Sequence, residues 1–70
     1  MKSIDKKKIF TLELEYNDES AVYAEIIVEG EPHEYRALLL MICRGTLMAS
    51  GAKRSTIYNS EGFEECAYMK

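Results

Sequence analysis

This 70-residue sequence contains few side chains suited to metal binding or acid–base chemistry. They are two cysteines, one histidine and twelve acidic residues. A structural zinc site needs four ligands in closely spaced pairs, whereas Cys43 and Cys66 are 23 residues apart and form no CxxC pair. His33 is the only histidine, and no GxSxG sequence offers it a nucleophilic serine. We therefore expect no metal, no cofactor and no catalytic residue, and predict that the protein is not an enzyme.

The remaining motifs exclude further classes of protein. Neither GxxxxGK[ST] nor GxGxxG is present, so the sequence indicates no loop for nucleotide phosphates. The longest apolar run, from Ala37 to Cys43, is far shorter than the roughly 20 residues that span a bilayer. Cys43 lies in this run and is interpreted as a small core residue. Two cysteines without a second pair favour reduced thiols in a cytoplasmic protein, and a Cys43–Cys66 disulfide stays open as an alternative.

Charge is distributed unevenly along the chain. Residues 1–8 hold four lysines and one aspartate (+3), whereas the rest holds five basic and eleven acidic residues (−6). We interpret residues 1–8 as a basic, flexible N-terminal segment and residues 9–70 as a single domain. Because four lysines lie beside a strongly acidic domain, direct binding of nucleic acid is not expected.

Hydrophobic periodicity predicts the elements of this domain. Residues 9–16 and 21–29 alternate between apolar and polar side chains, and four turn-forming residues separate them, which indicates a β-hairpin. Residues 32–50 read as one long helix, with a proline at its start and Gly51 just past its end. Residues 54–58 predict a third strand. Residues 63–69 fit a strand or a short helix, and the preceding glycine-containing turn favours the strand.

These elements predict an α+β fold of ββαββ order, in which the helix packs on one face of a small antiparallel sheet. Helical spacing places Leu38, Leu39, Ile42 and Ala49 on the side that faces the sheet. We expect them to meet either the apolar face of the first strand, Phe10, Leu12 and Leu14, or the equivalent residues of the second strand. Gly45 falls in the same sector, so we expect it to allow close approach to a strand; a kink at this glycine is the alternative.

The predicted helix also has a second apolar sector, which a single sheet cannot cover. Its large apolar residues are Leu40, Met41, Leu47 and Met48, and Arg44 falls among them. We predict that this sector is a protein–protein contact, in the first place with a second copy in a homodimer. Coverage by the chain's own ends and contact with a different protein are the alternatives.

The polar face of the predicted hairpin suggests a different function. Its carboxylates are Glu13, Glu15, Glu25 and Glu29. A row of carboxylates attracts arginines and lysines, so the alternative hypothesis is an acidic inhibitor that blocks a basic nucleic-acid-binding site on another protein. In size, acidity and ββα order the sequence is similar to many small accessory proteins of phages and mobile elements. A merely solvated sheet face is the simpler interpretation.

Overall fold

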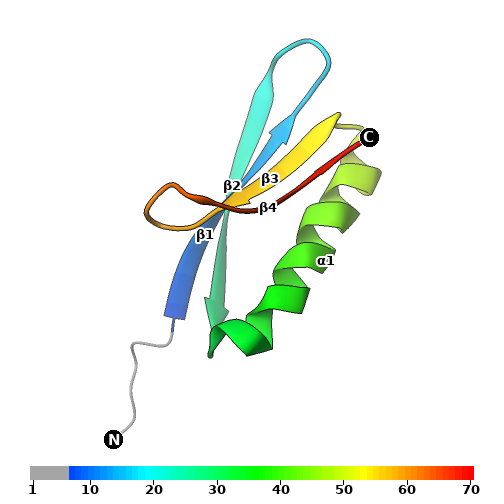
Figure 1. Ribbon diagram of the computed structural model, residues 1–70. Helices are drawn as coiled ribbons and strands as arrows, with labels where there is room; N and C mark the ends of the chain where they lie inside the picture. Colours follow the sequence, from blue (N-terminus) through cyan, green and yellow to red (C-terminus); the bar gives the residue numbers. More distant parts are fainter. Residues whose placement is uncertain (1–6) are drawn as a thin grey trace, which may run out of the picture.

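The computed structural model describes residues 7–70 and has four strands and one helix in ββαββ order (Figure 1). The elements are β1 (Lys7–Glu15), β2 (Ala21–Glu29), α1 (Pro32–Ser50), β3 (Arg54–Tyr58) and β4 (Glu64–Met69). The predicted α+β class is therefore confirmed. The third strand and the helix have the predicted bounds, and residues 64–69 form a strand.

All strand pairs are antiparallel, and the strands lie in the order β2-β1-β3-β4. The order arises because the helix connects two hairpins, and the second hairpin pairs through β3 with β1. β2 and β4 are therefore the two edges of the sheet. The sequence indicated the hairpins but not which strand of one would pair with which strand of the other.

The predicted N-terminal segment ends earlier than expected. Lys7 and Lys8 belong to β1, where they lie opposite Glu29 and Val28 of β2. An opposite charge across the strand pair suits a lysine at this position. The rest of the predicted segment, residues 1–6, lies outside the described residues.

Local chemistry fixes both ends of α1. Pro32 occupies the first turn, where its missing N–H removes no helical hydrogen bond. The Glu34 carboxylate accepts the backbone N–H of Glu31 at 2.6 Å, which satisfies a donor that the helix leaves free. Gly51 ends the helix in the left-handed conformation with φ of 78°, which a side chain would disfavour.

The core lies between α1 and the inner face of the sheet. The helix contributes a row at four-residue spacing, Tyr35, Leu39, Cys43 and Leu47, all buried. The sheet contributes Phe10, Leu12, Val28 and Ile57. Two residues of the predicted core set are outside it, since Leu38 is 46% exposed and Ala49 is also exposed. Compared with the prediction, the buried side of the helix is shifted around its axis and is centred near Cys43. The shift arises because α1 packs mainly on β3 and β4.

Candidate functional site

The side of α1 that faces away from the sheet carries exposed methionines. Met41, at the helix midpoint, is 69% exposed and Met48, two turns later, is 68% exposed, as the sequence predicted. We call this pair the methionine stripe. Leu40 is 38% exposed and lines a small cavity of about 210 Å³ against β4. Leu47, predicted for the same sector, is only 4% exposed and belongs to the core, because the helix is rotated towards β4.

The flank of α1 on the side of β1 and β2 is apolar and open. It carries Leu38, Gly45 and Ala49, which we call the glycine flank; all three are exposed. A Cβ atom built on Gly45 meets nothing within 4 Å outside the local helix backbone. Gly45 therefore does not allow close approach to a strand, contrary to the prediction, and the helix runs through it without interruption. No packing within the described chain explains this glycine.

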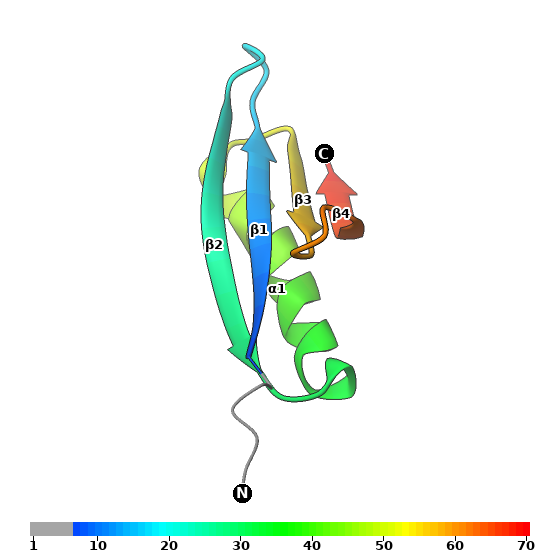
Figure 2. The same cartoon turned by 90° about the vertical axis from the view of Figure 1, so that its left-hand side faces the viewer.

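The inner face of β2 is the second uncovered apolar region. Val22, Ala24 and Ile26 point to the same side as the buried Val28, since alternate residues of a strand share a face. Val22 is nevertheless 52% exposed, Ala24 is exposed and Ile26 is half-buried. We call these three residues the β2 inner patch. Figure 2 shows β2 at the sheet edge, with β1 between it and the second hairpin.

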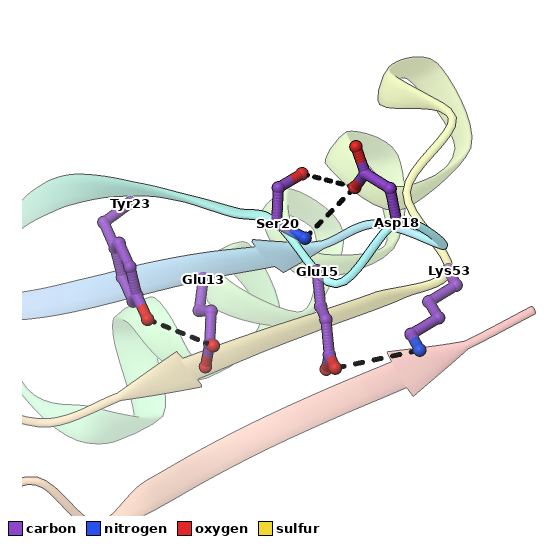
Figure 3. Close-up of polar contacts among 6 residues, drawn as sticks. All are labelled: Glu13, Glu15, Asp18, Ser20, Tyr23 and Lys53. Carbon is purple, nitrogen blue, oxygen red and sulfur yellow. Dashed lines mark hydrogen bonds and ion pairs between the residues drawn. The ribbon is translucent and has the colours of Figure 1, made fainter.

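The outer face of the hairpin holds the four predicted carboxylates on one side, as their register shows. Glu13 is bound by two tyrosines: the Tyr58 hydroxyl donates to Oε1 at 2.9 Å and the Tyr23 hydroxyl to Oε2 at 3.3 Å. Figure 3 shows Tyr23 directed at Glu13 and Lys53 directed at Glu15. The hairpin turn is closed separately by Asp18, which accepts from the Ser20 hydroxyl and N–H.

These contacts shift the pKa of both tyrosines upwards. The pKa of Tyr58 is raised chiefly because its hydroxyl donates to the Glu13 carboxylate, a bond that ionisation would remove. The pKa of Tyr23 is raised chiefly by the negative charge of Glu13. Glu13 on β1 thus accepts hydrogen bonds from side chains of both neighbouring strands, β2 and β3, and connects the three strands on the outer face.

Basic residues reduce the acidity of this face. Lys53 lies 3.8 Å from Glu15, and Arg54 lies 3.9 Å from Glu64 at the other edge of the sheet. Glu25 and Glu29 lie on the edge strand β2, and Glu29 is opposite Lys7. The face therefore carries a mixture of charges, with exposed carboxylates on β2 (Glu25 and Glu29) and at the β4 edge (Glu64).

A small polar cluster inside the core was not foreseen from the sequence. The Cys43 thiol donates to the Ser55 carbonyl at 3.3 Å and lies 3.2 Å from the Ser55 hydroxyl, both groups being buried. Cys66 is a free thiol near Cys43, and burial raises its pKa to about 12. A thiol with such a pKa stays protonated near neutral pH. The contacts of Cys43 with Ser55 join the middle of α1 to β3.

A hollow of about 440 Å³ lies between β1, the start of α1 and the β3–β4 turn, with Lys7, Lys8, Glu61 and Glu65 among its lining residues. Residues 7–70 bring together no group of three or more histidine, cysteine or carboxylate side chains able to hold a metal. Within the same residues, no helix combines the length and apolarity needed to cross a membrane.

Comparisons with protein-family models, with curated proteins and with solved structures found no match to this chain. The functional inference therefore depends on the exposed surfaces described above.

Proposed function

We propose that the protein is a small non-catalytic interaction module that associates with a second copy through the outer side of α1. The observation that supports this proposal is the methionine stripe. Met41 and Met48 are more than two-thirds exposed, although the same helix buries a full row of side chains on its other side. An unbranched, polarisable side chain adapts well to a partner surface.

The energy available from this stripe is substantial for a chain of this size. Complete burial of a fully exposed methionine contributes about 1.5–3 kcal/mol. Because Met41 and Met48 are 69% and 68% exposed, two copies that each bury both residues gain roughly 4–8 kcal/mol. Association costs an estimated 4–15 kcal/mol in lost translational and rotational freedom. The free energy gained by burying the stripe is thus close to the cost of association, and contacts around the stripe decide how stable the dimer is.

Sedimentation equilibrium of the full chain tests the proposal. We expect a dimer for the wild type and a folded monomer for the Met41→Glu/Met48→Glu variant, with the dimer dissociation constant raised at least about 100-fold. The matched control is Ile9→Glu/Ile27→Glu, which places the same charges on two exposed residues of the outer face. Circular dichroism checks the fold of each variant. A wild type that stays monomeric at millimolar concentration would refute self-association.

The acidic face supports a second candidate function, an acidic inhibitor of a basic nucleic-acid-binding site. Its support is that the four predicted carboxylates share one face, as the register between β1 and β2 requires. It ranks second because Glu13 and Glu15 already have partners within the chain. Reversal of Glu25 and Glu29 to lysine should abolish capture of a basic partner protein, while reversal of Glu64 on the far edge should not.

A further inference from the structure

We propose that in the dimer each α1 packs on the β2 inner patch of the other copy, so that the two helices lie side by side between two sheets. This inference rests on the proposed function and names the surface that receives the methionine stripe. It also assigns a partner to the glycine flank, which would contact the same flank of the second helix.

The first argument is that one chain leaves two apolar regions uncovered on the same side of the sheet. The methionine stripe lies on the side of α1 that faces away from its own sheet. The β2 inner patch lies on the sheet next to the helix, on a strand that the helix leaves largely open. Under two-fold symmetry, a contact from region i to region j is repeated from j to i. A second copy therefore covers both regions at once, whereas stripe-to-stripe packing would leave the β2 inner patch in water.

The second argument is the size of the contact. A helix of 19 residues is about 28 Å long and about 10 Å wide, so packing of two stripes face to face would bury on the order of 300 Å² per copy. A stable interface usually buries about 800 Å² per copy. The reciprocal arrangement comes closer to that size, because each copy contributes its stripe, its β2 inner patch and its glycine flank.

The third argument is the position of the small residues. Gly45 and Ala49 are four residues apart on the glycine flank, so both lie on one line along the helix. Small residues at this spacing let two helix backbones approach closely. A glycine in a helix interior costs about 1 kcal/mol relative to alanine, and at Gly45 no neighbour within the described chain offsets that cost. A second helix on this flank would offset it.

Two polar side chains of α1, Arg36 and His33, lie away from the proposed contact. Arg36 lies on the opposite flank, against β4, where it lines the 210 Å³ cavity with Glu65. His33 is exposed near the same flank at the helix start. In the proposed dimer both would stay at the rim in water, and the outer face with Glu13 would point away from the partner. Arg44 is exposed in the middle of α1, three residues after Met41 and four before Met48, so it lies beside the methionine stripe and would be at the contact with the partner sheet.

Substitutions in the β2 inner patch separate this inference from the proposed function. We expect Val22→Glu/Ala24→Glu to raise the dissociation constant of the dimer at least 100-fold, because it places charge beneath the partner helix. The matched control is Tyr23→Glu/Ile27→Glu, which changes the outer face of the same strand at residues of similar exposure. If only the methionine variant dissociates, the proposed function stands and this inference is overturned.

Cross-linking gives a second test that needs no destabilising charge. Each of Met41→Cys, Met48→Cys and Ala24→Cys is combined with Cys66→Ser, so that the added cysteine is the exposed thiol and Cys43 stays buried in the core. The variants are mixed in pairs under mild oxidation. We expect a disulfide-linked dimer when Ala24→Cys is mixed with at least one methionine variant, and little when any variant is oxidised alone. Cross-linking of Met41→Cys or Met48→Cys with itself would indicate stripe-to-stripe packing and would overturn the inference. A monomer that forms no cross-link would overturn both proposals.

Discussion

Two strands of this sheet, β3 and β2, have opposite environments. β3 lies inside the sheet, and its three middle residues, Ser55, Thr56 and Ile57, are almost completely buried on both faces. β2 is longer, but only Val28 of its nine residues is buried. The difference follows from α1, which covers β3 and β4 and leaves most of β2 open. Stability should therefore come mainly from the α1–β3–β4 half, and recognition from the β1–β2 hairpin and the outer side of α1.

The largest expected effect is a difference in stability between variants of two isoleucines, one in each half of the molecule. Ile57 is 0% exposed and Ile27 is 61% exposed. We expect Ile57→Ala to lower the free energy of unfolding by about 2–5 kcal/mol, because it removes a buried side chain and leaves a cavity. Ile27→Ala should change it by less than about 0.5 kcal/mol. Urea denaturation monitored by circular dichroism measures both.

A small domain has about 5–15 kcal/mol of stability in total, so the first variant should lose a large share of it. Equal losses for the two variants would contradict the division, since they would mean that the hairpin is as well packed as the core. Measurement at low protein concentration keeps any dimer from contributing to the difference.

A pair of glycines gives the next largest effect, with opposite signs. Gly51 has φ of 78°, so alanine there should cost about 1 kcal/mol of stability in backbone strain. Gly45 is inside α1 with open space around it, so alanine should stabilise the monomer by about 0.5–1 kcal/mol. Thermal denaturation of the monomer at low concentration checks both signs. A loss of monomer stability at Gly45→Ala would mean that this glycine has an intramolecular role.

Local patterns were sufficient to predict the elements of the fold. Alternation over residues 21–29 gave β2 its bounds, and a proline and a glycine at the two ends gave those of α1. Residues 63–69 fitted two periodicities, and the turn before them favoured the correct one. The strand order was beyond reach, because it depends on which edge of the first hairpin receives β3 after the helix, and no local pattern encodes that choice.

The sites were predicted less completely. The exposure of Met41 and Met48 followed from helical spacing. Leu47 was predicted to be exposed and is buried, whereas Leu38 was predicted to be buried and is exposed. Helical spacing fixes the angles between side chains but does not determine how the helix is rotated on the sheet. That rotation depends on how far α1 lies towards β4. The contact of Tyr58 with Glu13 was missed for a different reason: it depends on β3 lying next to β1, and the strand order was unknown.

The smallest expected effect is a difference in how the pKa values of Tyr23 on β2 and Tyr58 on β3 respond to salt. Both tyrosines that contact Glu13 have a raised pKa, but the main cause for Tyr58 is a hydrogen bond within the sheet and the main cause for Tyr23 is an exposed charge. Ionic screening acts on exposed charges and reaches about 3 Å at 1 M salt, against about 30 Å at 0.01 M. High salt should therefore lower the pKa of Tyr23 towards its ordinary value of 10.0 and change that of Tyr58 less.

Ultraviolet titration of tyrosinate in the wild type, with Tyr23→Phe and Tyr58→Phe to assign the signals, measures these shifts. Glu13→Gln should lower both pKa values at any salt concentration, because it removes the charge and weakens the acceptor. Since each pKa is higher in the folded chain than in the unfolded one, the stability it reflects is fully present below about pH 10 and is lost as pH rises through the folded pKa. Equal salt sensitivity of the two tyrosines would mean that Glu13 is as exposed towards β3 as towards β2, and that the outer face does not share the asymmetry of the inner one.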